Sequence, residues 1–229
     1  MDDDPSSVLS LPPEEWAALR PWVDRPIPAP PYPEPGPVLA DRVRGMLLGL
    51  AIGDALGNTS EGMNPAGRRR RYGEIRDYLP NWWADWLRVG VPSDDTQMAF
   101  WTVESLLRRD GLDPADVAAS FAGGRIFGIG KTVTRFVLAY REQGLPWHRA
   151  GVESAGNGAL MRIAPVVLPH LRPPVDATGG ALPLWADVIA ATVVTHRDEA
   201  AVSASVGLVG LLMESLALDV TRPAAGSGA

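Results

Sequence analysis

The sequence contains no cysteine, which excludes disulfide bonds, thiolate metal sites and cysteine nucleophiles. It has no excess of positive charge either: the formal net charge is -6 at pH 7, which argues against nonspecific binding to nucleic acid. The front of the chain also lacks a long hydrophobic run: the longest one there, residues 46–52, is far too short to cross a bilayer. Any metal must therefore use oxygen or imidazole ligands, and a discrete substrate is favoured over a polyanion.

The first residues, Met1 to Asp4, are acidic and lead into prolines, so they lack the basic start and apolar stretch of a secretory signal. We expect a soluble, cytoplasmic protein that does not enter a membrane. The 229 residues, of which 46% are hydrophobic, suffice for one full-sized domain with a buried core.

Proline divides the chain. Residues 1–37 hold half of the 22 prolines and are predicted to form an extended N-terminal arm, within which a short helix could dock Trp16 and Leu19 on the main body. Residues 38–220 are predicted to form a helical domain, and residues 221–229 a flexible tail.

Helical spacing of apolar residues begins at Asp41, and no segment shows the alternation of a strand. Further helices are expected to start at Ser93, with Thr96, Phe100, Val103 and Leu107 as its buried stripe, and at Pro114. Others are expected over residues 132–142, 184–195 and 198–218, with long loops at 58–92, 123–131 and 151–165. The pattern predicts an all-α fold, a compact bundle of helices.

Glycine recurs at every fourth position of the first long helix, at residues 45, 49, 53 and 57. Four helix-weakening glycines in register indicate a stripe on which another backbone packs closely.

The segment Ser93-Asp94-Asp95-Thr96 has two interpretations. Adjacent acids at a helix start offer the oxygen ligands that Mg²⁺ prefers, and the Ser93 hydroxyl can join them. Alternatively, the serine caps the helix and the acids offset its dipole.

A second acidic pair is Asp54, on the apolar face of its helix, and Glu61 in the loop after it. A carboxylate on an apolar face must be paired, hydrogen-bonded or near a metal. The alternatives are a structural bond from Asp54 to a backbone amide or an arginine, and plain solvent exposure for Glu61.

Two glycine-containing loops could bring backbone amides close to a phosphate: residues 127–132 and residues 154–162. The second loop is not a Walker loop, because no lysine and hydroxyl residue follow its last glycine, and the first could equally be a tight interhelical turn. His196, in Thr195-His196-Arg197-Asp198, could orient a substrate or serve as a helix-boundary contact. Trp82, Trp83 and Trp86 could stack an adenine or form a lid on the core, and the arginines at 68–71 are expected in a solvated loop unless they meet a phosphate.

Four motifs in order carry a resemblance over residues 41–205: Gly-Asp-Ala-Leu-Gly with a following glutamate, Ser-Asp-Asp-Thr, Gly-Asn-Gly-Ala-Leu-Met-Arg and Thr-His-Arg-Asp. The chain resembles the ADP-ribosylglycohydrolase family. The resemblance implies an all-helical orthogonal bundle whose cleft holds two Mg²⁺ ions and ADP-ribose. It also implies hydrolysis of the glycosidic bond that links ADP-ribose to a protein side chain or another acceptor.

The resemblance implies a role for each motif. Glu61, Asp94 and Asp95 would be catalytic, with Ser93, Asp94 and Asp95 as metal ligands. Substrate would be bound by Gly128, Ile129, Gly130, Lys131, Asn157, Gly158, Met161 and His196. The expected partner is ADP-ribose or an ADP-ribosylated protein, with no membrane and no nucleic acid.

One family motif, an Asp-x-Asp-Thr segment beyond Asp198, is missing. We therefore expect a C-terminally truncated form of the fold, whose uncovered apolar faces favour a homodimer. The alternative function is a noncatalytic protein that binds ADP-ribose or a nucleotide with an incomplete metal site.

Overall fold

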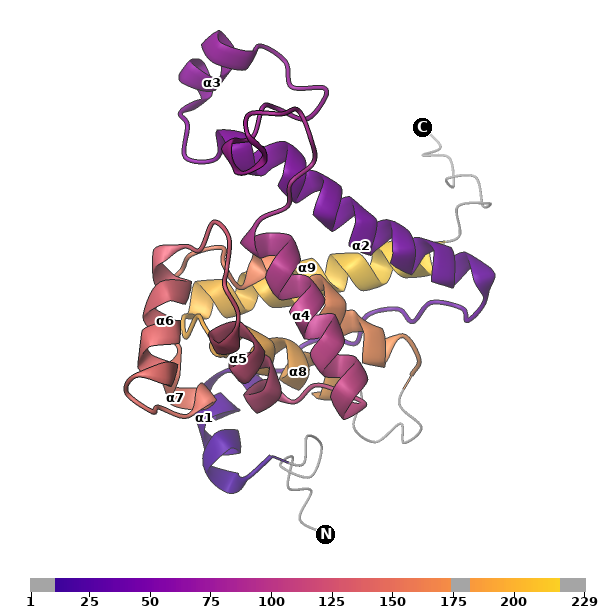
Figure 1. The fold of residues 1–229 in the computed structure, drawn as a ribbon. Helices are drawn as coiled ribbons and strands as arrows, with labels where there is room; N and C mark the ends of the chain where they lie inside the picture. The colour runs from indigo at the N-terminus through magenta and orange to yellow at the C-terminus, as the bar shows by residue number, and fades with distance from the viewer. Residues whose placement is uncertain (1–10, 174–181, 219–229) are drawn as a thin grey trace.

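The structure, a computed structural model, describes residues 11–173 and 182–218, and these fold as helices joined by loops (Figure 1). Extended pairing among them is limited to two isolated bridges, Asn81 with Leu87 and Val152 with His196. The predicted all-α class is confirmed. The tail predicted at 221–229 lies outside the described residues.

The α-helices follow the chain as α1 (Pro13–Val23), α2 (Pro37–Gly57), α3 (Pro65–Tyr72), α4 (Asp94–Arg109), α5 (Pro114–Gly123), α6 (Lys131–Arg141), α7 (Trp147–Ala150), α8 (Leu182–Val193) and α9 (Glu199–Ala217). Short 3-10 helices are η2 (Asn58–Ser60), η3 (Trp82–Ala84), η4 (Leu160–Arg162) and η5 (Ala164–His170). The helices predicted from residues 93, 114, 132, 184 and 198 are all present. The loops predicted at 58–92 and 151–165 are wrong in part, because they contain α3 and the 3-10 segments.

Helix α8 is the centre of the core, since every residue from Leu184 to Val193 is buried. Helix α9 packs along it, and by length and composition alone α9 is apolar enough to cross a membrane. Helix α1 packs on the other side, where Trp16 and Leu19 join the core cluster as the sequence predicts. The N-terminal segment thus contributes a helix to the same core that supports the site.

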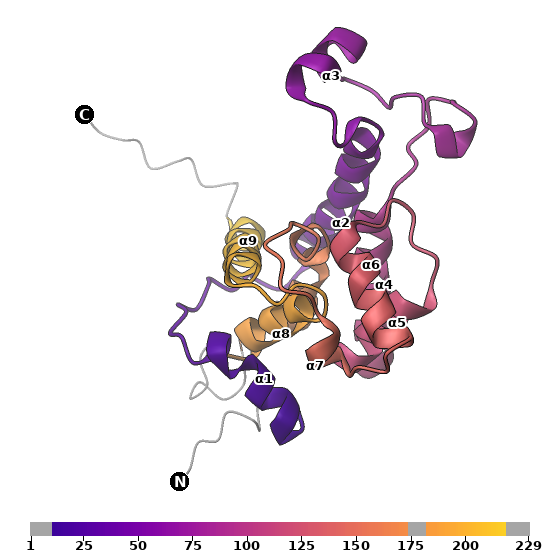
Figure 2. The same cartoon turned by 90° about the vertical axis from the view of Figure 1, so that its left-hand side faces the viewer.

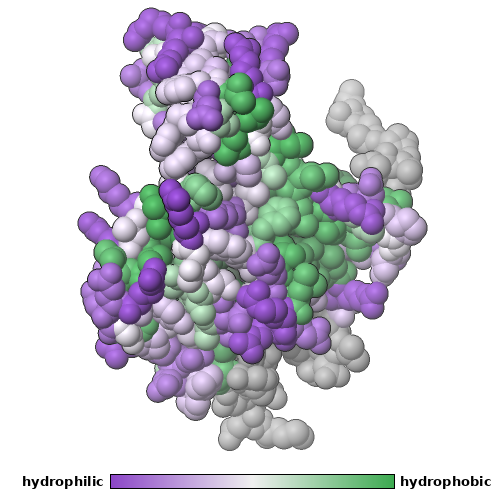
Figure 3. Space-filling view, viewed as in Figure 1, coloured by the Kyte–Doolittle hydropathy of each residue, from purple (hydrophilic) through white to green (hydrophobic). Residues whose placement is uncertain are grey.

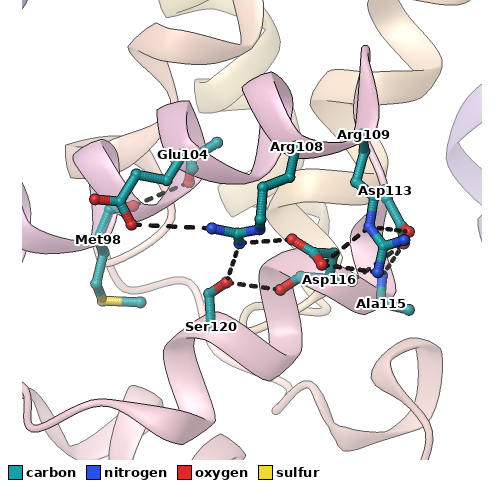
Figure 4. A network of polar contacts seen from close by, with 9 residues as sticks. Met98, Glu104, Arg108, Arg109, Asp113, Ala115, Asp116 and Ser120 are labelled. Atoms are coloured by element: carbon teal, nitrogen blue, oxygen red, sulfur yellow. Dashed lines mark hydrogen bonds and ion pairs between the residues drawn. The ribbon is translucent and has the colours of Figure 1, made fainter.

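Helices α4 and α5 are joined by an arginine and aspartate network (Figure 4). Arg108 donates to Asp116 at 2.7 Å and to Ser120 at 2.9 Å, and Arg109 lies 2.9 Å from the other oxygen of Asp116. Burial alone would raise the pKa of Asp116, but the hydrogen bonds from Arg108 and Arg109 outweigh burial and lower it. The network fixes the C-terminal end of α4, and so the direction in which its N-terminus points.

Of the predicted buried stripe of α4, only Thr96 is buried: Val103 is half-buried, Phe100 is 40% exposed and Leu107 is 80% exposed. The buried face instead consists mainly of small or polar residues, namely Asp94, Thr96, Met98, Ala99, Thr102, Ser105 and Leu106. Small side chains let α4 approach η4, η5 and α5 closely, and hydropathy alone undervalues such a face.

Helix α2 extends away from the bundle and carries α3 near its far end (Figures 1 and 2). Ala55 is the only residue of α2 that is buried, while Val38, Leu48 and Ile52 are exposed. Hydrophobic residues accordingly gather over this part of the surface (Figure 3). A Cβ added at any of the four glycines of the stripe would meet no atom within 4 Å. The close backbone contact predicted there is therefore absent within the described chain.

Candidate functional site

A cavity of about 540 Å³ opens where the C-terminal end of α2, the N-termini of α4 and α6, and the loop at 156–158 meet. Five separate stretches of the chain contribute to its wall, namely residues 53–68, 94–95, 128–133, 156–161 and 196. The lining residues are Gly53, Asp54, Gly57, Asn58, Ser60, Glu61, Gly62, Met63, Arg68, Asp94, Asp95, Gly128, Gly130, Lys131, Thr132, Val133, Gly156, Asn157, Gly158, Met161 and His196.

Asp54, on α2, binds the first turn of α4. Its Oδ2 accepts the backbone amides of Ser93 at 2.7 Å and Thr96 at 3.1 Å, and also the Thr96 hydroxyl at 2.6 Å. Burial alone would raise the pKa of Asp54, but the bonds from Ser93, Thr96 and Asn58 outweigh it and lower the pKa. Of the alternatives for Asp54, the bond to backbone amides is the one that the structure contains.

Ser93 is the N-cap residue of α4, yet its side chain makes no capping hydrogen bond. Its hydroxyl donates to Asp54 Oδ1 at 2.6 Å instead. The carboxylate of α2 thus satisfies the amides that an N-cap side chain usually accepts. Asp94 and Asp95 follow in the first turn and line the cavity.

The acids of the cavity repel one another. Burial, followed by the charges of Asp95 and Glu61, raises the pKa of Asp94 from 3.8 to about 6. Burial, followed by the charges of Asp54 and Glu61, raises that of Asp95 to about 6 as well. Among the ion pairs of the described residues, none involves Glu61, Asp94 or Asp95. The cavity therefore holds negative charge that a cation would stabilise.

Gly128 closes the wall beside this acid pair. Its backbone has φ +78°, and an added Cβ would lie 3.0 Å from Asp94 Oδ1 and 3.3 Å from Ser93 Cβ. Both the left-handed conformation and the close approach require glycine here. The loop predicted to bind substrate thus also supports the acid pair.

The start of α6 forms a further part of the wall. Its N-cap residue, Gly130, offers no side chain, so the first amides of the helix are left without a side-chain acceptor. Lys131 is the first residue of α6, and the Thr132 hydroxyl lies 3.0 Å from that of Ser154. An uncapped helix start beside a lysine is suited to a phosphate group.

His196 lies behind the loop at 156–158. A Cβ on Gly158 would lie 2.8 Å from Cε1 of the ring, and one on Gly156 would lie 3.5 Å from Nε2. The small residues predicted to admit a ligand thus make room for the imidazole. Asn157 and Met161 line the cavity from the same segment, and Met161 donates its amide to the Asn157 carbonyl.

A sequence profile of the ADP-ribosylglycohydrolase family matches residues 35–226. The chain belongs to the ADP-ribosylglycohydrolase family. It is 36% identical over 165 residues to ADP-ribosyl-[dinitrogen reductase] glycohydrolase from Rhodospirillum rubrum, which covers 71% of this chain and 53% of the relative. It is 29% identical over 174 residues to ADP-ribosylarginine hydrolase Tri1 from Pseudomonas putida, with 71% and 43% covered. The chain spans about half the length of these relatives.

The acids of the cavity would provide part of the shell for the Mg²⁺ ion that the sequence predicts in this ADP-ribosylglycohydrolase chain. Asp94, Asp95 and Glu61 are hard oxygen donors, which suit Mg²⁺. Within residues 11–173 and 182–218, however, no three His, Asp or Glu side chains converge closely enough to hold an ion between them. The donor chemistry fits the cation, and the remaining positions of the shell would be taken by water or by further ligands.

Most residues that the sequence assigned to the ADP-ribosylglycohydrolase site line this cavity. Ile129 does not: it is 37% exposed and lies outside the lining. Ser93 lines a neighbouring hollow of about 490 Å³, together with Trp83, Phe100 and Phe127. The tryptophan lid is wrong, because Trp82, Trp83 and Trp86 are 57%, 42% and 64% exposed rather than packed on the core.

Sequence reasoning also missed contributors to the ADP-ribosylglycohydrolase cavity. Arg68 lines it from α3, where a solvated loop was expected. Asn58 joins the two sides of the long loop, since its side chain donates to the Val91 carbonyl at 2.6 Å and accepts from the buried Asn81. Asn64 before Pro65 is a helix-start signal that would have revealed α3.

Proposed function

We propose that this chain hydrolyses the glycosidic bond that links ADP-ribose to a protein side chain or another acceptor, with Mg²⁺ as cofactor. One observation supports this most strongly: the acids and the uncapped start of α6 open into the same cavity. A ligand that combines a cationic reaction centre with a diphosphate matches a cavity that contains both kinds of group.

Different cavity residues would bind the ribose and the diphosphate of ADP-ribose. Asp94, Asp95 and Glu61 would hold Mg²⁺ and stabilise positive charge at the anomeric carbon of the ribose. When bound, the cation would lower the pKa of a water molecule and orient the ribose hydroxyls. Lys131 and the first amides of α6 would bind the diphosphate.

The names of the relatives support an ADP-ribosylated protein as the substrate partner. The test is release of free ADP-ribose from an ADP-ribosylated protein by the purified chain, with and without Mg²⁺. We expect release that depends on Mg²⁺ and is lost in Asp94→Ala and Asp95→Ala. Release without Mg²⁺ in the presence of a chelator would contradict the cofactor assignment.

The second candidate is a protein that binds ADP-ribose without cleaving it. It is favoured by the structural use of Asp54, whose two carboxylate oxygens already accept hydrogen bonds from Ser93 and Thr96. Calorimetric titration with ADP-ribose separates the two. Binding that requires Mg²⁺ supports the hydrolase, whereas binding that ignores Mg²⁺, with no release of product, supports the second candidate.

We further propose that the chain forms a homodimer through α2. The exposed Leu48 and Ile52 flank the glycine stripe, so this face combines apolar side chains with room for a close neighbour. Sedimentation velocity over a range of concentrations tests this, and a chain that stays monomeric throughout would refute it.

A further inference from the structure

The side chain of Arg162, on η4, is buried without a carboxylate partner. It is 1% exposed, and no ion pair among the described residues includes it. Its guanidinium lies over the Phe121 ring, 4.6 Å from the centroid. Nη2 donates to the Ala191 carbonyl at 3.1 Å and to Thr195 Oγ1 at 2.6 Å, whereas Nε and Nη1 have no partner.

The bond from Arg162 sets the direction of the next one. A guanidinium only donates, so the Thr195 oxygen must accept. The hydroxyl has one proton left to give, and His196 Nδ1 lies 2.8 Å away. Among the described residues, the Thr195 hydroxyl has no other hydrogen-bond partner. If Nδ1 carried the proton, the fully buried Thr195 would keep a hydroxyl proton without an acceptor.

The opposite edge of the imidazole faces the cavity. Nε2 would lie 3.5 Å from a Cβ on Gly156 and 3.1 Å from a Cβ on Gly158, so this edge is turned toward the glycine loop. No hydrogen bond between described residues uses Nε2, and His196 lines the cavity. The backbone of His196 is held in place as well, because its amide donates to the Thr192 carbonyl at 2.9 Å.

We infer that Arg162 and Thr195 are positioning residues that fix His196 in the tautomer carrying its proton on Nε2, as a permanent hydrogen-bond donor to an oxygen of the bound ADP-ribose. The identity of the ligand rests on the proposed function. The tautomer does not, because it follows from contacts within the chain.

The charges around the ring support this role. Burial, followed by the positive charge of Arg162, lowers the pKa of His196 to about 4, and Asp198 at the start of α9 opposes the shift. Six further charged residues line the same cavity as the His196 ring, namely Asp54, Glu61, Arg68, Asp94, Asp95 and Lys131. Arg162 itself stays protonated at neutral pH, since burial lowers its pKa only to about 9. His196 therefore donates a hydrogen bond without exchanging a proton near neutrality.

The direct test is nitrogen-15 NMR of the histidine rings in the ligand-free protein at neutral pH. The chain has three histidines, and the His196→Gln variant assigns the signal. We expect His196 protonated on Nε2. In Thr195→Val, which removes the hydroxyl but keeps the shape, we expect that preference to be lost, and in Thr195→Ser we expect it to be retained. An Nδ1 proton in the parent chain, or an unchanged ring in Thr195→Val, would overturn the inference.

A second variant and a binding measurement complete the test. In Arg162→Met we expect the His196 pKa to rise toward its ordinary value, and if that variant does not fold, Thr195→Val still decides. Loss of one oriented donor should weaken ADP-ribose binding roughly 3- to 10-fold in Thr195→Val and leave Thr195→Ser near the parent. The expected tautomer without any ADP-ribose binding would leave the positioning role standing and would remove the proposed function.

Discussion

The Ser93 hydroxyl lies 2.6 Å from Asp54 Oδ1, although the two residues are 39 positions apart in the chain. This bond joins α2 to the start of α4. Asp54, in the Gly-Asp-Ala-Leu-Gly motif, thus holds the first turn of α4, and with it Asp94 and Asp95, at the cavity.

Replacing Asp54 should therefore damage both stability and metal binding. Asp54→Ala removes the acceptor of four bonds from Ser93 and Thr96. Since bonds to a charged group contribute about 1.5–3 kcal/mol, we expect the free energy of unfolding to fall by about 2–4 kcal/mol. Urea denaturation at pH 7 measures this, and Mg²⁺ titration should show weaker binding.

Asp113→Ala is the matched control. Asp113 caps α5 through the amides of Ala115 and Asp116, away from the cavity. The Asp113→Ala substitution should lower the free energy of unfolding by about 1 kcal/mol and leave the Mg²⁺ affinity unchanged. An Asp54→Ala variant no less stable than this control would show that the link between α2 and α4 is unimportant.

Replacing Asp95 should have the opposite effect on stability. Its pKa rises from 3.8 to about 6 on folding, so the folded protein binds more protons than the unfolded chain between those values. Stability then falls as pH rises through that window. Asp95→Asn removes the penalty, and we expect the Tm of the metal-free protein at pH 7 to rise by roughly 2–4 °C for each kcal/mol gained.

The same variant carries its own control. Near pH 3, below both pKa values, the parent carboxyl is protonated in the folded and the unfolded chain, so the Tm difference should shrink. Calorimetry at the two pH values measures it. A Tm gain that is equal at both would mean that repulsion among the acids is not its cause. At pH 7, Mg²⁺ binding should be weaker in the variant than in the parent.

Comparing Gly128→Ala with Gly130→Ala separates the effect of backbone strain and close contact from the effect of merely replacing a glycine in this loop. Gly128 has φ +78° and lies against Asp94, whereas a Cβ on Gly130 meets nothing within 4 Å. We expect Gly128→Ala to destabilise the chain by about 1–2 kcal/mol and to weaken Mg²⁺ binding, because the acid must move. Gly130→Ala should cost less, about 0.5 kcal/mol, because alanine is a poorer N-cap than glycine, and it should leave Mg²⁺ binding unchanged. Equal effects in urea denaturation would contradict this account.

The open glycine stripe gives a test of the proposed dimer. A Cβ on Gly49 meets no atom, so Gly49→Ala should stabilise the monomer by about 0.5–1 kcal/mol through helix propensity. Gly49→Met should also fold, but its longer side chain would keep a second helix at a distance. We expect sedimentation velocity to show dimers for the parent and monomers for Gly49→Met. Dimers of equal affinity in both would exclude this face as the interface.

Much of the fold and of the candidate site could be predicted from the sequence. Caps and periodicity gave the helix starts at Asp94 and Pro114, since those signals are local. Most of the site residues could be assigned because short motifs carry them. The partner of Asp54, by contrast, is set by how α2 crosses α4, and local spacing contains no information about a contact across 39 residues.

The features that the sequence predicted wrongly, or did not predict, also depend on tertiary contacts. Phe100 and Leu107 are apolar and well spaced, yet the buried side of α4 was decided by close approach to η4, η5 and α5. The chain of bonds from Arg162 through Thr195 to His196 joins two motifs that the sequence separates by more than thirty residues. Which atoms face each other across that distance is a property of tertiary packing.

The thin attachment of α2 determines where the molecule opens first. Only Ala55 of its 21 residues is buried, and Leu39, Val43 and Met46 are only partly covered, so separating α2 from α4 exposes less apolar surface than unfolding α8, where every residue from Leu184 to Val193 is buried. Amide hydrogen exchange should therefore reveal a low-energy partial unfolding that releases the Thr96 amide from Asp54 long before the α8 amides are lost. The acid pair would be dismantled in that opening with the core intact, and a cation or ligand bound in the cavity would suppress it.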